Sequence, residues 1–199
     1  DILVLQRVFN RKIPFLNFFL KKELIYVPIL GLCWWALDFP FMTRTSKAQL
    51  KKNPKLRGKD IETTRKACEK FKEMPVSIVN FVEGTRFTTQ KHARQNSPFP
   101  HLLKPKAGGI AFVMQAMGEQ ISKVVNVTIH YPDGIPTFMD FAGGKVKQIN
   151  VHVDIRPVSE ELIGDYTGDS EFRVGFQSEL NRLWEEKEHT LLQLEQNHK

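Results

Sequence analysis

Cysteine is scarce in this chain. Only Cys33 and Cys68 occur among its 199 residues, and no Cys-x-x-Cys pair is present. Two isolated cysteines argue against a disulfide framework and against a zinc site, and they favour a reducing compartment. No internal repeat and no signal peptide is visible. The chain begins at Asp1 without a methionine, which predicts that it is part of a longer protein.

A charge-free segment long enough to cross a membrane is also lacking. The most apolar window runs from Leu24 to Met42, nearly the length of a span, but it contains Asp38 and two prolines. A carboxylate inside a bilayer is costly, so we expect short strands and a helix here in place of a span. The Trp34-Trp35 pair fits a membrane interface or a protein core equally well.

Positive charge is in excess, with 29 Lys and Arg against 22 Asp and Glu, a net charge of +7. This excess fits an acidic partner, whether nucleic acid, an anionic membrane surface or a phosphorylated substrate. The sequence has neither the Cys/His spacing of a finger nor the aromatic strand of an RNA-binding module, which disfavours nucleic acid.

Strands that alternate with helices predict an α/β fold. We expect a single domain over residues 1–199, with a mixed, mostly parallel sheet flanked by helices. The Phe-rich segment 11–22 predicts an interfacial helix or an ordinary core-facing helix. Further helices are predicted at residues 1–9, 28–36, 61–73, 106–117 and 172–194. Strands are predicted at 23–27, 39–43, 75–80, 124–131 and 145–155, a polar basic stretch at 46–59, and loops at 87–105 and 136–144.

One stretch concentrates polar chemistry directly after a predicted strand: Phe81-Val82-Glu83-Gly84-Thr85-Arg86. The glycine lets the backbone approach a ligand closely, the threonine offers a hydroxyl, and the arginine offers a planar fork that suits phosphate. The stretch therefore predicts an anion pocket, with a tight turn and a surface arginine as the alternative.

Four further stretches accompany this one in a fixed order. They are Lys21-Lys22-Glu23-Leu24 with Pro28 and Gly31, Phe41-Met42-Thr43-Arg44, Leu103-Lys104-Pro105-Lys106 with Gly108-Gly109, and Val127-Thr128-Ile129-His130-Tyr131-Pro132. Together the five resemble the motifs of the glycerolipid acyltransferase family, and they cover residues 1–132. Details such as Trp34-Trp35 are similar to the lysocardiolipin-type and bacterial inner-membrane subgroup. Residues 133–199 carry no motif and are expected to complete the domain.

The resemblance implies roles for particular residues. The family's catalytic base is a histidine in Asn-His-x4-Asp, yet no histidine here has an aspartate five positions later. The segment that begins at Asp1 resembles the end of that motif and its continuation, so we predict that Asp1 orients a histidine upstream of this chain. Thr128 stands where many relatives have proline. The substrate phosphate and glycerol are expected to bind at Arg44, Glu83, Gly84, Thr85 and Arg86, and the acyl donor or acyl chain near Lys106 and Pro132.

The activity that the resemblance implies is transfer of a fatty acyl group from a thioester to the free glycerol hydroxyl of a lysophospholipid, above all 1-acyl-glycerol-3-phosphate. Acyl-CoA or acyl carrier protein is a co-substrate, and no cofactor or metal is expected. Glu83 either accepts a hydrogen bond from the substrate's glycerol hydroxyl or forms an ion pair with an arginine. We expect a phospholipid surface as partner, no nucleic acid, and an active site on the cytoplasmic side of a bacterial inner membrane or an equivalent organelle membrane. Without the motif histidine these 199 residues alone are expected to be inactive, and the alternative is an inactive membrane-surface protein that keeps the acyltransferase shell.

Overall fold

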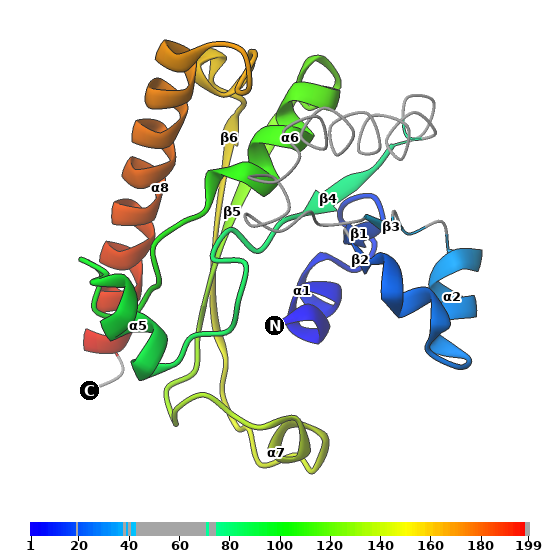
Figure 1. The fold of residues 1–199 in the computed structure, drawn as a ribbon. Helices are drawn as coiled ribbons and strands as arrows, with labels where there is room; N and C mark the ends of the chain where they lie inside the picture. Colours follow the sequence, from blue (N-terminus) through cyan, green and yellow to red (C-terminus); the bar gives the residue numbers. More distant parts are fainter. Residues whose placement is uncertain (19, 38, 40, 43–70, 72–74, 198–199) are drawn as a thin grey trace. The chain divides into compact units, whose positions relative to one another are not determined.

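The computed structural model describes residues 1–18, 20–37, 39, 41–42, 71 and 75–197 (Figure 1). The chain divides into two compact units, a first unit of residues 1–82 and 108–120 and a second unit of residues 83–107 and 121–199. The structure does not fix the position of one unit relative to the other, so each is described by itself. The prediction of a single domain over residues 1–199 stays a prediction.

The first unit contains parallel strand pairs and helices, which confirms the α/β class. Strand β1 pairs in parallel with β4, with Leu16 opposite Ser77, and β2 pairs in parallel with β3. Its elements are α1 (Ile2–Phe9), β1 (Leu16–Phe18), β2 (Leu20–Lys21), η1 (Lys22–Tyr26), α2 (Leu30–Ala36), β3 (Phe41–Met42), β4 (Ser77–Val79), α6 (Ala107–Met117, from Gly108 on) and η2 (Gly118–Gln120).

Stacked aromatic rings form part of the core of this unit. The Phe18 ring stacks on Phe39 at 6.2 Å and on Phe81 at 6.1 Å between ring centroids. Helix α6 approaches the chain just after β4 so closely that a Cβ on Gly109 would lie 3.2 Å from Asn80 Nδ2. Phe18 and Phe39 are buried in the core, whereas Phe81, just after β4, is 47% exposed and stacks on Phe18.

Two predictions for this unit are wrong. Residues 11–18 and 20–21 do not form a helix: Arg11 has φ +60°, Pro14 has no backbone N–H to donate, and residues 16–18 are buried in the parallel pairing with β4. Residues 22–26 form a 3-10 helix in place of the predicted strand. The predicted helix at 61–73 and the basic stretch at 46–59 lie outside the described residues, apart from Phe71.

The second unit is an antiparallel hairpin covered by a long helix (Figure 1). Strands β5 and β6 pair along their whole length, with Val127 opposite Val153, and α8 packs on β5. Leu103 and Phe176 are completely buried in its core, beside Leu180 and Trp184. Its elements are α5 (Thr89–Gln95), β5 (Lys123–His130), α7 (Phe138–Ala142), β6 (Asn150–Pro157), η3 (Glu160–Leu162) and α8 (Ser170–Gln196).

Both predicted loops of this unit contain a short helix. Thr88 caps α5 inside the predicted loop 87–105, and a capping box of Thr137 and Asp140 starts α7 inside the predicted loop 136–144. Strand β6 begins at Asn150, five residues later than predicted. Helices of five and seven residues are too short to show a hydrophobic period, so only their caps mark them.

The segments that the structure describes contain no helix that is both long and apolar enough to cross a membrane.

Candidate functional site

A glycine turn lies at the centre of the site in the second unit. Gly84 adopts φ +65°, a conformation that side chains other than glycine rarely accept. A Cβ at this position would lie 3.5 Å from Lys106 Cδ and 3.6 Å from Lys106 Nζ. The glycine therefore both permits the turn and leaves its backbone open beside an ammonium group.

A second ammonium group, from α5, fastens the same turn. The Thr88 hydroxyl accepts a hydrogen bond from the backbone N–H of Lys91 (3.2 Å), which starts the helix and places Lys91 in its first turn. Lys91 Nζ then donates to Thr85 Oγ1 at 2.8 Å and to the Arg86 carbonyl oxygen at 3.0 Å. Lys91 thus holds the backbone and the hydroxyl of the motif in a fixed arrangement.

The guanidinium of Arg86 remains available at this turn. Arg86 is exposed, and none of the residues that the structure describes makes a hydrogen bond or ion pair with its guanidinium. Arg86 thus belongs to a turn that carries the Thr85 hydroxyl and that receives the ammonium groups of Lys91 and Lys106 from neighbouring segments. Such a set suits a phosphate, because charge-assisted hydrogen bonds to an anion are roughly twice as strong as neutral ones.

Glu83, the one carboxylate of the turn, is half-buried. Its Oε1 accepts a hydrogen bond from the backbone N–H of Leu103 at 3.2 Å. Burial raises the pKa of Glu83, while the Leu103 N–H and the ammonium groups of Lys187 and Lys106 act to lower it. The nearby cations therefore oppose the effect of burial on the pKa of this carboxyl group.

The predicted site residues separate into those that the structure brings together and those that it does not. Glu83, Gly84, Thr85 and Arg86 form the turn, and Lys106, expected near the acyl donor, lies beside Gly84. Pro132 lies instead in the turn after β5, where the Gly134 N–H donates to the Tyr131 carbonyl.

Two predicted residues cannot be related to this turn. Asp1 occupies the N-cap position of α1 in the first unit, without a side-chain capping hydrogen bond. Arg44 lies outside the described residues. Their roles as the orienting aspartate and the second clamp stay predictions.

Sequence reasoning misses two lysines at this site. The pattern predicts only a loop around Lys91, although Thr88 three residues earlier is a recognisable N-cap signal. Lys187 belongs to α8, in the part of the chain without a motif. Its spacing of three residues from Trp184 places both on one helix face, but nothing in the sequence indicates that this lysine turns inward.

The histidines of this unit contact other groups. His92 Nε2 lies 2.6 Å from the Phe99 carbonyl oxygen, and His101 Nδ1 lies 2.6 Å from Oε1 of the buried Glu188. Within the described ranges, no histidine hydrogen-bonds to Glu83, Thr85 or Arg86. The catalytic histidine upstream of Asp1 stays a prediction.

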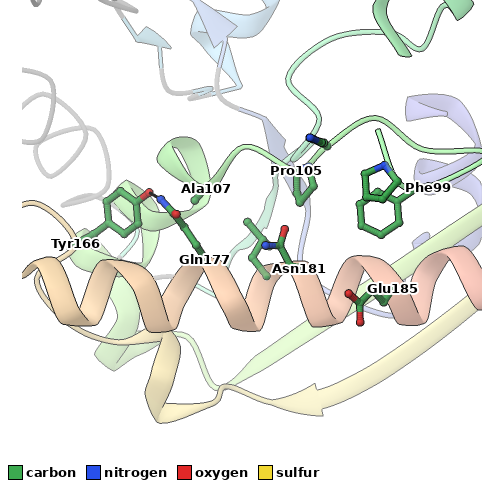
Figure 2. A pocket seen from close by; sticks show the side chains of 10 residues that line it. Phe99, Pro105, Ala107, Tyr166, Gln177, Asn181 and Glu185 are labelled. Carbon is green, nitrogen blue, oxygen red and sulfur yellow. Dashed lines mark hydrogen bonds between the residues drawn. The ribbon is translucent and has the colours of Figure 1, made fainter. Parts of the chain in front are cut away.

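A separate cavity of about 470 Å³ lies between α8 and the segment before α6 (Figure 2). Phe99, Pro105 and Leu180 give it apolar walls, and Gln177 Nε2 donates to the Tyr166 hydroxyl at 2.9 Å. No residue of the Glu83–Arg86 turn lines this cavity. It is therefore distinct from the Glu83–Arg86 turn.

Comparison with known proteins decides the family. The family model described as Acyltransferase matches residues 1–131, which is most of the chain. The chain belongs to the acyltransferase family. The resemblance to glycerolipid acyltransferases is thereby confirmed, and the narrower subgroup stays a prediction.

Named relatives of this acyltransferase-family chain support the assignment. It is 26% identical over 151 residues to human 1-acyl-sn-glycerol-3-phosphate acyltransferase delta, which covers 70% of the chain and 37% of that relative. It is 26% identical over 153 residues to 1-acyl-sn-glycerol-3-phosphate acyltransferase 3 of Arabidopsis thaliana (71% and 38%). The mouse gamma enzyme of the same name is 22% identical over 179 residues (84% and 43%). The chain thus spans about two fifths of the length of these relatives, and no solved structure matches it.

Proposed function

We propose that the protein containing this chain transfers a fatty acyl group from a thioester, acyl-CoA or acyl carrier protein, to the free glycerol hydroxyl of a lysophospholipid. The observation that carries the proposal is the Gly84 turn, where Arg86 is exposed, Lys91 bonds to the Thr85 hydroxyl and Lys106 lies beside the Gly84 backbone. The substrate named for the relatives, 1-acyl-glycerol-3-phosphate, has such an anion next to its free hydroxyl.

Binding the phosphate would hold the substrate hydroxyl in position for the reaction. An alcohol is a weak nucleophile at neutral pH, so a base has to remove its proton as its oxygen attacks the thioester carbonyl and the thiolate leaves. We assign that base to a histidine upstream of Asp1, with Asp1 orienting its ring. Such a base supplies about 10²–10⁴-fold in rate, and holding the hydroxyl at a fixed distance from the clamped phosphate adds a proximity contribution.

A transferase assay tests this proposal. The full-length protein, in native membranes, is given radiolabelled acyl-CoA or acyl carrier protein together with 1-acyl-glycerol-3-phosphate or another lysophospholipid. We expect labelled diacyl product with at least one pair of substrates. Full-length protein that binds the lysophospholipid but forms no product with either donor would favour the alternative, an inactive membrane-surface protein.

We also propose that the chain works at a phospholipid surface on the cytoplasmic side of its membrane. In the first unit, Tyr26, Ile29, Leu32 and Trp35 are each more than 60% exposed, although they are large and apolar. In the second unit the tip of the β5–β6 hairpin also exposes large apolar side chains. Ile135, Phe138 and Met139 are each more than 70% exposed. Exposed apolar groups of this kind are typical of interaction surfaces.

Hairpin-tip residues give a direct test of membrane contact. Changing Ile135, Phe138 and Met139 to serine should weaken binding of the 199-residue chain to phosphatidylcholine–phosphatidylglycerol vesicles by at least about tenfold in partition coefficient, because each buried side chain of this size is worth roughly 1.5–3 kcal/mol. Vesicle flotation measures the bound fraction. Val174→Ser, at another exposed apolar position (67%), is the control and should bind like the unaltered chain. Equal binding by the triple variant would contradict contact through the tip.

A further inference from the structure

The long helix α8 lies beyond the family-matched residues, yet it reaches the motif turn. Trp184 Nε1 donates a buried hydrogen bond to the Leu103 carbonyl oxygen at 2.9 Å. The N–H of the same residue, Leu103, donates to Glu83 Oε1 at 3.2 Å. Leu103 is fully buried, so α8 holds the residue that in turn holds the Glu83 carboxylate.

One turn further along α8, Lys187 turns inward. Its Nζ donates to the Val127 carbonyl oxygen at 2.5 Å and to Thr128 Oγ1 at 3.3 Å, both on β5. The ammonium lies 5.7 Å from the centre of the Trp184 ring, whose face attracts cations. A lysine that lacks an ion-pair partner among the described residues is unusual in a partly buried place, because removing an ammonium from water is costly.

Glu83 is the carboxylate whose charge acts on this partly buried cation. Burial lowers the pKa of Lys187 to about 8, and the charge of Glu83 acts in the opposite direction. The influence is mutual, because burial raises the pKa of Glu83 and the charge of Lys187 lowers it. The two charges therefore stabilise each other in a setting that penalises either one alone.

We propose that α8 positions the acyl-acceptor site. Trp184 holds Leu103, whose N–H orients the Glu83 carboxylate to accept a hydrogen bond from the glycerol hydroxyl of the lysophospholipid. Lys187, held on β5 one turn further along α8, is a positioning residue that supplies a countercharge to this carboxylate. Burial and a bound phosphate both favour the protonated form of a carboxyl group, and a countercharge opposes them. The role rests on the proposed function, and it assigns a task to the part of the chain that carries no family motif.

The charged groups that act on Glu83 determine the expected pH dependence. Lys106 and Lys187 favour its ionised form, and Glu188 disfavours it. Removing Lys187 should raise the pKa of Glu83 further, so activity that needs the carboxylate should appear only at higher pH.

Kinetics of three full-length proteins test the role. Lys187→Met should raise KM for the lysophospholipid about tenfold near neutral pH and move the acid limb of kcat/KM up by on the order of one pH unit, with KM for the acyl thioester unchanged. Lys187→Arg should restore the acid limb, since arginine keeps the positive charge. Lys145→Met, which removes an exposed lysine paired with Asp140, is the control and should keep the normal profile.

A stability cycle separates this proposal from the transferase proposal. Melting temperatures are compared for the full-length protein with Glu83→Gln, Lys187→Met and both changes together. If the two charges interact, the double variant should lose less than the sum of the single losses, whether or not the protein is a transferase. Additive losses, or a Lys187→Met variant that is merely less stable with an unshifted pH profile, would overturn the role, whereas an inactive but coupled protein would overturn only the transferase function.

Discussion

Replacing Arg86 with alanine in the full-length protein should lower kcat/KM for the lysophospholipid by about 10²–10³-fold. A guanidinium can make two hydrogen bonds to one phosphate, and each bond to a charged group is worth roughly 1.5–3 kcal/mol, with every 1.4 kcal/mol equal to a factor of ten. Arg86 is exposed and only its carbonyl oxygen is used within the turn, so the melting temperature should hardly change.

Two further variants sharpen this test. Arg86→Lys keeps the positive charge but loses the planar guanidinium that can make two hydrogen bonds to one phosphate. Its kcat/KM should therefore lie between those of the unaltered protein and Arg86→Ala. Arg94→Ala removes another exposed arginine, on α5, and should retain nearly full activity. Activity of Arg86→Ala within about threefold of normal, given the size of a single charged hydrogen bond, would remove Arg86 from the phosphate clamp.

The largest loss of stability should come from Phe176→Ala. Phe176 has no exposed surface, and its ring lies 5.3 Å from that of Tyr166 and 6.1 Å from that of Phe172. Truncation to alanine removes the buried ring and leaves a cavity that the packed helix cannot fill, so the free energy of unfolding should fall by about 3–5 kcal/mol. Urea unfolding followed by circular dichroism measures this change.

The matched control lies in the same unit. Phe138 on α7 is 73% exposed, so Phe138→Ala should change the free energy of unfolding by no more than about 0.5 kcal/mol. A loss of less than about 1 kcal/mol for Phe176→Ala, far below the usual range for a buried ring, would mean that α8 is not packed as described.

How far the sequence predicts the fold depends on element length. The 27-residue helix α8 and the eight-residue strand β5 are recognisable because hydrophobic periodicity needs several turns or pleats to show. Residues 16–18 are mistaken for part of a helix because three residues carry no period. Their strand state is set by pairing with Ser77–Val79, about sixty residues away, and no local pattern contains that information.

The candidate site shows the same division. Glu83, Gly84, Thr85 and Arg86 are identifiable because they are consecutive, and the positive φ of Gly84 gives that glycine a physical reason. Lys91 and Lys187 escape notice because their approach to other segments depends on how α5 and α8 are positioned, which is a tertiary property. Site residues that are consecutive in the chain can therefore be predicted from the sequence. Residues that reach the site from distant segments cannot.

The pairing of β5 with β6 limits where this chain can be joined to a relative in a chimaeric protein. The family-matched region stops at Tyr131, directly after β5, whereas the strand paired with β5 is contributed by Asn150–Pro157. A chimaera joined at that boundary would import a foreign β6 and a foreign α8 against a resident β5. An exchange of segments between homologues should give a folded protein only if β5 and β6 come from the same parent. The unit to exchange is therefore the β5–β6 hairpin together with α8.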